Sequence, residues 1–156
     1  MRLAARPATT RFRGLLVPLL LTLAACSNPP YPRGSIEALY PQPPRPMLKR
    51  VVLADRQLQF AEMPAAAAAN NGTPLLFVHG SPGDWKAWAR YLDAPELAGE
   101  GVRIAVDRPG YGGSGAGAVM TDLRAQAALL AQLIPPGSPA ILIGHSLGGP
   151  LVGWIA

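Results

Sequence analysis

The sequence predicts an α/β fold in which helices cover both faces of a mainly parallel sheet. Three short apolar runs have the length and composition of buried strands: residues 74–78, 102–106 and 140–143. Helical patterns alternate with these runs, at residues 84–92, 119–134 and 147–156. Strands that alternate with helices are typical of parallel sheets, because each helix carries the chain back to the edge where the next strand starts.

The segment before the first of these strands predicts a different kind of structure. Residues 50–62 alternate loosely and contain a polar break at Asp55-Arg56, which predicts two short strands joined by a turn. Residues 63–73 are rich in alanine and end in Asn-Asn-Gly, so they predict a loop with a helical turn.

The helical patterns carry start and stop signals. Asp84 is a candidate N-cap, and Trp85, Trp88 and Leu92 follow at helical spacing, which favours a core position for both tryptophans over the wall of a substrate pocket. The helix predicted for residues 119–134 has Thr121 or Asp122 near its start and Pro-Pro-Gly directly after it.

The segment Gly144-His145-Ser146-Leu147-Gly148 joins the third apolar run to the last helix, and this order predicts a nucleophile elbow. A serine on such a turn has an unfavourable backbone conformation, and the close packing around it requires glycine at positions 144 and 148. The turn exposes the Ser146 hydroxyl and directs the start of the next helix at it, so the Leu147 N–H can stabilise an oxyanion. The alternative is a serine that only caps the helix.

Two further segments resemble the α/β-hydrolase family. His79-Gly80-Ser81 follows the strand at residues 74–78, and resembles the His-Gly-x motif that ends the family's third strand. Residues 107–114, Asp-Arg-Pro-Gly-Tyr-Gly-Gly-Ser, resemble the loop after its fourth strand. The resemblance implies that the Ser81 N–H completes the oxyanion hole, and that His79 and Gly80 shape the loop. It covers residues 50–156 and implies that the family's later strands lie beyond this segment, which would leave a hydrophobic strand edge exposed.

The family resemblance also implies a catalytic triad in the chain order Ser, Asp or Glu, His. Residues 150–156 contain neither an acid nor a histidine. His145 lies on the elbow itself, where neighbouring side chains diverge, and His79 belongs to the oxyanion loop, so neither fits the general base. Asp107 and Ser114 are interpreted as turn and loop residues; for Tyr111, the pocket mouth and loop packing both stay open.

The first 25 residues have the layout of a secretory signal peptide. Arg2, Arg6, Arg11 and Arg13 precede an apolar run, residues 15–25, that ends in small residues. This run is short for a transmembrane helix and Pro18 interrupts it. Leu23-Ala24-Ala25-Cys26 resembles a bacterial lipobox, which implies a lipid on Cys26 and a membrane-anchored protein of the cell envelope. The alternative is an ordinary cleavage site, with a periplasmic or secreted product.

The sequence therefore divides into a signal peptide at residues 1–25, a lipidated cysteine with a Pro-rich tether at 26–49, and the N-terminal part of a hydrolase domain at 50–156. Seven prolines between residues 29 and 46 favour an extended tether, although residues 35–40 could form one helical turn. An incomplete domain of this kind is expected from a fragment of a larger protein or from a truncated gene product.

Composition argues against two classes of function. The formal charge is +5, but without the four arginines of the signal ten basic and nine acidic side chains remain, a net of +1. Nucleic-acid binding therefore loses its main support. Two separated histidines and one cysteine do not form a metal site, and the glycine-rich loop at residues 110–117 lacks the Lys-Ser/Thr ending of a phosphate loop, so no cofactor is expected.

Two functional hypotheses remain. In the first, Ser146 attacks a carboxylic ester, or a thioester or amide, and forms an acyl-enzyme, with the triad Asp and His supplied from beyond residue 156. Serine at the nucleophile position argues against the family's dehalogenase and epoxide-hydrolase branches, which use aspartate. In the second, the chain is a catalytically inactive hydrolase-fold remnant or a surface-tethered binding protein.

Overall fold

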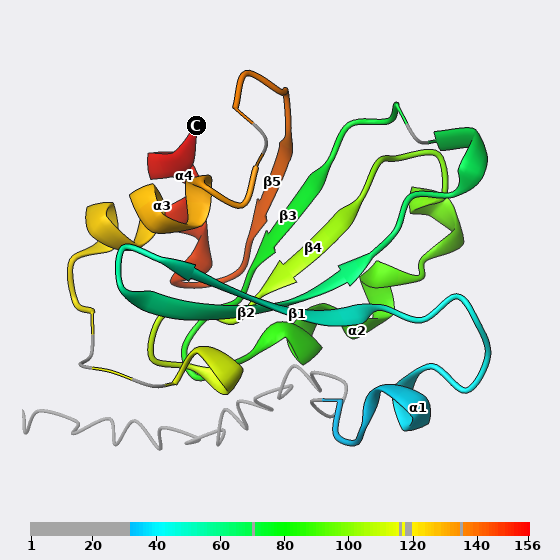
Figure 1. Cartoon of the computed structure of the whole chain (residues 1–156), viewed down its shortest axis with the longest axis horizontal. Coiled ribbons are helices and arrows are strands. Elements are labelled where there is room, and N and C mark those ends of the chain that lie inside the picture. Colours follow the sequence, from blue (N-terminus) through cyan, green and yellow to red (C-terminus); the bar gives the residue numbers. More distant parts are fainter. Residues whose placement is uncertain (1–31, 70, 116, 118–119, 135) are drawn as a thin grey trace, which may run out of the picture.

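A computed structural model describes residues 32–69, 71–115, 117, 120–134 and 136–156 (Figure 1). Its centre is a five-stranded sheet in the order β1-β2-β4-β3-β5. The strands are β1 (Met47–Leu53), β2 (Arg56–Met63), β3 (Leu75–Val78), β4 (Arg103–Val106) and β5 (Ile141–Gly144). The strands predicted for residues 74–78, 102–106 and 140–143 are thus confirmed to within one residue at each end.

The sheet is mixed but mostly parallel. β3 pairs in parallel with β4 and with β5, whereas β2 pairs antiparallel with both β1 and β4. All strands except β2 therefore run in one direction. β1 and β2 form the predicted hairpin, whose turn at Ala54 and Asp55 has positive φ angles at both residues.

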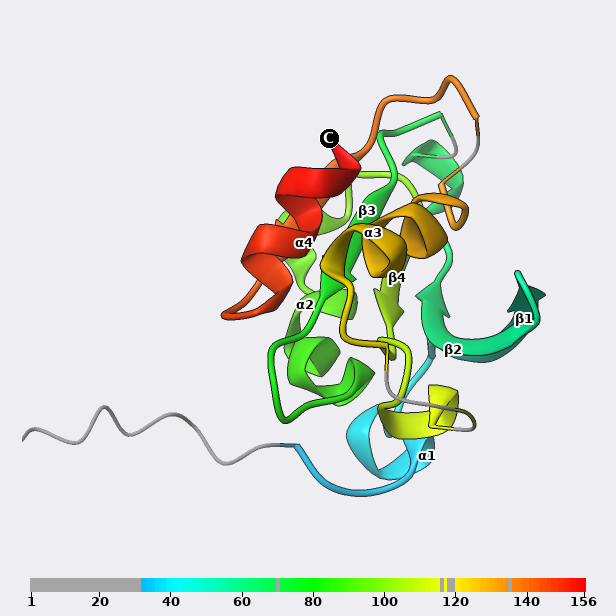
Figure 2. The ribbon, with the colours of Figure 1, turned by 90° about the vertical axis from the view of Figure 1, so that its left-hand side faces the viewer.

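Helices lie on both faces of the sheet, as predicted (Figure 2). The helices are α1 (Ile36–Leu39), α2 (Ala89–Leu92), α3 (Leu123–Ala131) and α4 (Gly148–Ile155), with a 3-10 turn, Trp85–Trp88, directly before α2. Further 3-10 turns are formed by Ala67–Ala69, Pro95–Leu97 and Gly112–Ser114.

Alternate side chains of the strands belong to two hydrophobic cores, one on each face of the sheet. Leu75 and Phe77 of β3 face one side of the sheet, where both predicted core tryptophans and Leu92 are buried against them. Leu76 and Val78 face the other side, where they pack with buried leucines of α3 and α4. Because successive strand side chains point to opposite faces of the sheet, one short apolar run packs against helices on both faces.

Capping residues determine where the helices begin. Asp84 accepts a hydrogen bond from the Lys86 N–H, and Asp122 accepts from the Arg124 and Ala125 N–H groups. Both aspartates are therefore the N-caps that the sequence predicted. α3 is shorter than the prediction of residues 119–134, since it starts only after its cap and ends at Ala131; Val119 and Pro135 lie outside the described residues.

The tether predicted for residues 26–49 is too long at its C-terminal end. β1 begins at Met47, and Tyr40 is only 3% exposed, with its hydroxyl donating to the Ala89 carbonyl. Arg45 also donates to the carbonyls of Tyr40 and Pro41. The folded unit therefore begins near the predicted helical turn α1, because the buried Tyr40 anchors this Pro-rich segment to α2. The signal peptide and Cys26 lie outside the described residues.

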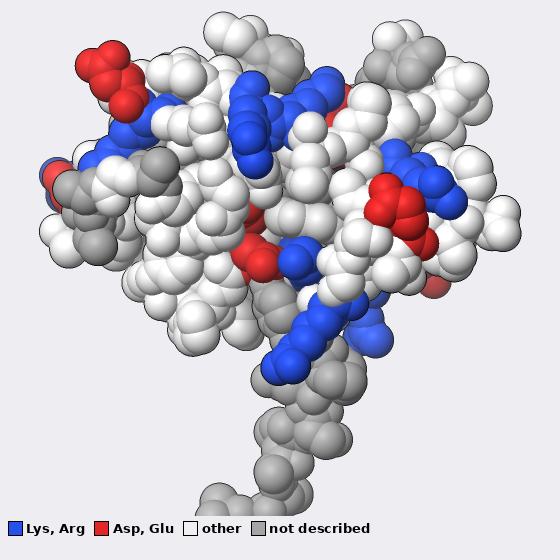
Figure 3. Space-filling view, turned by 60° about the horizontal axis from the view of Figure 1, so that its bottom comes forward, with Lys and Arg blue, Asp and Glu red and all other residues white. Residues whose placement is uncertain are grey.

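The surface has an exposed apolar strand edge and mixed charges. β5 is the last strand of the sheet order, and its first residue, Ile141, is 42% exposed. On the face shown in Figure 3, Lys and Arg side chains are interspersed with Asp and Glu side chains. Within the described residues, no helix has the length and apolar character needed to cross a membrane.

Candidate active site

Ser146 lies on a tight turn between β5 and α4, with a φ angle of 52°. Serine rarely adopts this left-handed conformation, which costs about 1–3 kcal/mol. Two backbone hydrogen bonds hold the turn, from the Gly148 N–H to the His145 carbonyl at 2.8 Å and from the Gly149 N–H to the Ser146 carbonyl at 2.9 Å. The side chain of Ser146 is exposed, so the structure has the elbow geometry that the sequence predicted.

Glycine is required on both sides of this turn for steric reasons. A Cβ atom at Gly144 would overlap the Gly148 carbonyl, and a Cβ atom at Gly148 would overlap the Val78 carbonyl. In both cases the obstructing atom belongs to the backbone, which cannot rotate away as a side chain can. The two glycines thus let α4 approach the ends of β3 and β5 closely.

The first turn of α4 faces the exposed serine. Leu147 is the N-cap residue of α4, and no side chain caps the helix at this end. The N–H groups at a helix N-terminus lack intrahelical acceptors and carry a partial positive charge. The Leu147 N–H, predicted to belong to an oxyanion hole, is therefore at the positive end of an eight-residue helix.

The loop after β3 lies directly against the elbow. A Cβ atom built on Gly80 would be 2.9 Å from the Ser146 Cβ and 3.1 Å from the His145 carbonyl oxygen. Tertiary structure thus brings the predicted oxyanion loop, 79–81, to the predicted nucleophile across 65 residues of sequence.

Both ring nitrogens of His79 are engaged in shaping this loop. Nε2 accepts a hydrogen bond from the Arg108 N–H at 3.0 Å, so the proton is on Nδ1, which donates to the Gly80 carbonyl at 2.7 Å. The imidazole is fully buried, and burial lowers the pKa of His79 to about 4. A histidine with both nitrogens occupied and a low pKa does not serve as a general base near neutral pH.

This pKa predicts a pH dependence of stability. Unfolded histidine titrates near pH 6.5, so between about pH 6.5 and pH 4 the unfolded chain binds a proton that the folded chain excludes. The contribution of His79 is complete above about pH 6.5 and is lost as the pH falls towards 4, by about 3 kcal/mol. Urea unfolding at intervals from pH 7 to pH 4 measures it. The decline should be smaller in His79→Asn and preserved in His145→Asn, which alters an exposed imidazole; equal declines in all three proteins would contradict the prediction.

Arg108 is a residue of this site whose role the sequence analysis did not assign. Its side chain is 1% exposed, and Nη2 donates to the Gly80 carbonyl at 2.8 Å. Nη1 donates to Gln126 of α3 at 3.3 Å, and the guanidinium lies 4.4 Å from the centre of the Tyr111 ring. The available signal was a basic residue two positions after the end of a buried strand, inside the loop whose sequence resembles that of the family.

Tyr111 covers this cluster. Its hydroxyl and the Ser81 Oγ are 2.8 Å apart, and this hydrogen bond, the largest cause, lowers the pKa of Tyr111. The ring also makes an edge contact with His79. Tyr111 therefore packs against the loop and holds the Ser81 side chain, as the loop-packing interpretation predicts.

Asp107 and Ser114 are structural residues, as the sequence analysis proposed. The Asp107 carboxylate accepts hydrogen bonds from the N–H groups of Trp85 and Gly113 and from the Gln59 side chain. Burial is the largest influence on the pKa of Asp107 and raises it. The Ser114 hydroxyl donates to the Asp107 carbonyl and accepts from the Gln59 N–H. The bonds to Gln59 tie the 107–114 loop to β2, the bond from Trp85 ties it to the 3-10 turn before α2, and the others lie within the loop.

His145 lies on the elbow directly before Ser146. Its side chain is exposed, and its backbone N–H donates to the Val78 carbonyl, which ties the elbow to β3. The described residues include no cluster of three or more potential metal ligands among histidine, cysteine, aspartate and glutamate.

A family model described as "Alpha/beta hydrolase family" matches residues 75–155. The chain belongs to the alpha/beta hydrolase family. The matched range includes the oxyanion loop, the 107–114 loop and the elbow, so the family assignment rests on the segments that form this site.

The chain is also similar to individual proteins and solved structures. The dihydrolipoyllysine-residue acetyltransferase component of the acetoin cleaving system of Pseudomonas putida is 33% identical over 106 residues, 67% of this chain and 27% of that protein. Among solved structures, Cfl2 from Burkholderia cenocepacia matches with a TM-score of 0.59 and 29% identity over 70% of this hydrolase chain and 36% of that chain. Epoxide hydrolase A from Mycobacterium thermoresistibile matches with a TM-score of 0.58 and 26% identity, over 70% and 34%. The chain thus spans about a third or less of the length of these similar proteins.

Proposed function

We propose that this α/β-hydrolase is a serine hydrolase that cleaves carboxylic esters through an acyl-enzyme on Ser146. The observation that carries the proposal is the backbone of Ser146, an exposed hydroxyl residue at a φ angle of 52° with Gly80 packed against it. A strained residue held in place by close backbone packing is typical of a functional site. The position at the positive end of α4 favours the development of negative charge there.

The proposed reaction has two steps. In the first, the Ser146 Oγ attacks the carbonyl carbon, its proton passes to a general base, and the carbonyl oxygen becomes an oxyanion near the N–H groups of Ser81 and Leu147. The alcohol then leaves with that proton. In the second, water attacks the acyl-serine, the acid is released and the serine recovers its proton.

We propose that the general base and its carboxylate partner come from a region that the longer similar proteins contain and this chain does not span. This follows from the described histidines, because both nitrogens of His79 are engaged in the loop and His145 is adjacent to the nucleophile on the elbow. Some similar structures are epoxide hydrolases by name. Serine in place of their branch's aspartate favours ester cleavage here.

Covalent labelling tests the proposal. A fluorophosphonate reacts with an activated serine, so the full-length gene product should be labelled on the peptide that contains Ser146, as identified by mass spectrometry. A folded full-length protein that fails to react would contradict the enzyme proposal.

The second candidate function is a non-catalytic binding protein or remnant. It is favoured by one observation, that both ring nitrogens of His79, in the loop beside Ser146, are engaged in hydrogen bonds. The DNA downstream of codon 156 separates the two candidates. A continuing frame with an aspartate followed by a histidine supports the enzyme, whereas an immediate stop supports the remnant.

We also propose that the protein is exported to a bacterial envelope and carries a lipid on Cys26. The support is the basic and apolar order of residues 1–25 and the single cysteine directly after them. Metabolic labelling with a palmitate analogue should mark the wild-type protein and be lost in Cys26→Ala. Labelling that persists in the variant would reject the lipid site.

A further inference from the structure

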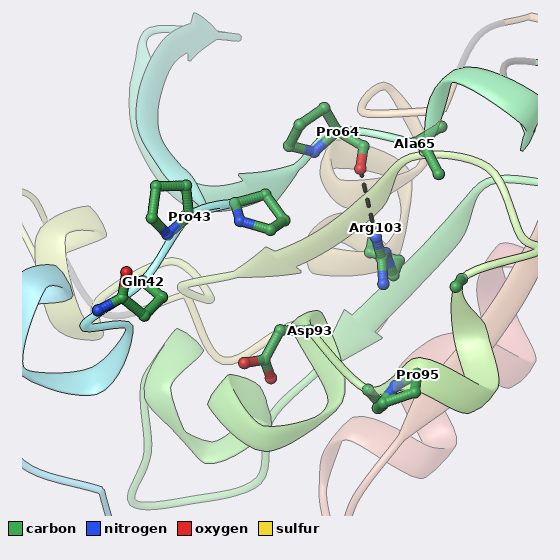
Figure 4. Close-up of a pocket in the computed structure, with 11 residues that line it drawn as sticks. Gln42, Pro43, Pro64, Ala65, Asp93, Pro95 and Arg103 are labelled. Carbon is green, nitrogen blue, oxygen red and sulfur yellow. Dashed lines mark hydrogen bonds between the residues drawn. The ribbon is translucent and has the colours of Figure 1, made fainter.

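A cavity of about 380 Å³ lies at the end of the sheet opposite Ser146 (Figure 4). Arg103 is the first residue of β4 and pairs with Met63, the last residue of β2, whereas the candidate active site follows the last residues of β3, β4 and β5. The cavity is therefore separate from the proposed catalytic centre. Its volume is within the range of about 300–1,000 Å³ that is common for small-molecule sites.

A buried cation lines this cavity. Arg103 is 5% exposed, and one of its terminal nitrogens, Nη2, donates to the Pro64 carbonyl at 3.3 Å. Its Nε is buried and has no hydrogen-bond partner in the described part of the chain. A buried guanidinium that no carboxylate of the described residues pairs favours a ligand that brings an acceptor oxygen, and a carboxylate fits best because it balances the charge.

The opposite charge is at the rim. Asp93 lines the same cavity and is exposed, and it does not form an ion pair with Arg103. Figure 4 shows Arg103 between Pro64 and Asp93. Burial, the largest cause, lowers the pKa of Arg103, and the charge of Asp93 opposes this effect. Two opposite charges that do not pair with each other thus line one cavity.

The remaining walls are mostly apolar. They come from three segments far apart in sequence, and include Pro43, Pro44, Pro64, Pro95 and Ala98. Proline rings present rigid apolar surface, so the protein loses little conformational entropy when a ligand binds against these walls. A carboxylate alone would be repelled by Asp93, whereas a molecule with an ammonium group close to its carboxylate satisfies both charges.

We propose that this cavity binds a small apolar α-amino acid, with its carboxylate on Arg103, its ammonium group on Asp93 and its side chain against the prolines. The site is independent of Ser146 and of the proposed esterase activity. Binding here and fluorophosphonate labelling of Ser146 can therefore succeed or fail separately.

Three matched ligands test the charge pattern on the full chain. Leucine carries both charges, 4-methylpentanoate lacks the ammonium group and isopentylamine lacks the carboxylate. Saturation-transfer NMR and calorimetry should show the tightest binding for leucine and the weakest for isopentylamine. An absence of leucine binding at millimolar concentrations, or equal binding of the three ligands, would overturn the proposal.

Variants of Arg103 and Asp93 test which charged group of the ligand each residue binds. Arg103→Met should weaken binding of leucine and 4-methylpentanoate about tenfold or more. Asp93→Asn should weaken leucine about tenfold and leave 4-methylpentanoate unchanged or tighter, since the repulsive carboxylate is gone. Glu96→Gln is the matched control, because Glu96 is a nearby exposed acid that does not line the cavity, and it should bind leucine like the wild type.

The Asp93 variant keeps the test decisive if Arg103→Met does not fold. Asp93 is exposed, so Asp93→Asn should retain the wild-type circular dichroism spectrum. Wild-type affinity for leucine in Asp93→Asn would reject the amino-acid assignment. Wild-type affinity in a folded Arg103→Met protein would reject the site.

Discussion

Ser146→Ala is expected to lower kcat for ester hydrolysis by the full-length protein by about 10³-fold to 10⁶-fold, the range observed when a catalytic serine is removed. Only the Oγ atom is lost, and it carries the bond to the acyl group in the proposed mechanism. Stability should change by less than about 0.5 kcal/mol, because the residue is exposed and the substitution keeps the Cβ atom. KM should change much less than kcat.

A chromogenic acetate ester provides the assay, and thermal unfolding measured in parallel separates lost chemistry from lost structure. Ser138→Ala is the matched control, since Ser138 is also exposed and lies in the loop before β5. It should keep wild-type kcat and fluorophosphonate labelling. Full activity in a folded Ser146→Ala protein would remove Ser146 from the mechanism.

Gly148→Ala should destabilise the protein by about 3 kcal/mol or more and abolish labelling of Ser146. The added methyl group would overlap the carbonyl of Val78, so α4 must move away from the end of β3. Overpacking of a well-filled site costs about 1–3 kcal/mol, and more where the obstacle is backbone that cannot rotate aside. The movement also displaces the Leu147 N–H from the nucleophile.

The neighbouring glycine is a control for this prediction. A Cβ atom at Gly149 would meet no atom within 4 Å, although the residue lies in the same turn of α4. Alanine is a better helix former than glycine by up to about 1 kcal/mol, so Gly149→Ala should leave stability unchanged or raise it. Urea unfolding of both variants measures the difference. Equal losses at the two positions would mean that helix formation, and not the contact with Val78, determines the effect.

Local patterns predicted the strands and the elbow well. The apolar runs at 74–78, 102–106 and 140–143 correspond to β3, β4 and β5, and the elbow serine has the backbone strain expected from its sequence position. These features depend on neighbouring residues: a run of apolar side chains for a buried strand, and small residues beside a tight turn.

Features that depend on distant partners were not predictable in the same way. Prolines between residues 29 and 46 favoured an extended tether, yet Tyr40 is buried against α2, nearly 50 residues later. Arg108 and Arg103 are ordinary basic residues in the sequence. Both are buried because carbonyl groups from other segments, those of Gly80 and Pro64, accept their hydrogen bonds.

Sequence patterns predicted the family resemblance, the parallel core of the sheet and the position of the strained serine. The strands and the strained turn follow from interactions between residues close together in the chain, such as strand periodicity and the steric demands of one turn. Only the folded structure showed which residues meet: Gly80 lies against Ser146, the His79 imidazole is buried, and Arg103 lines a cavity. The physical reason is that hydrogen bonding and desolvation depend on the full set of neighbours of a group, and folding brings most of those neighbours from distant segments.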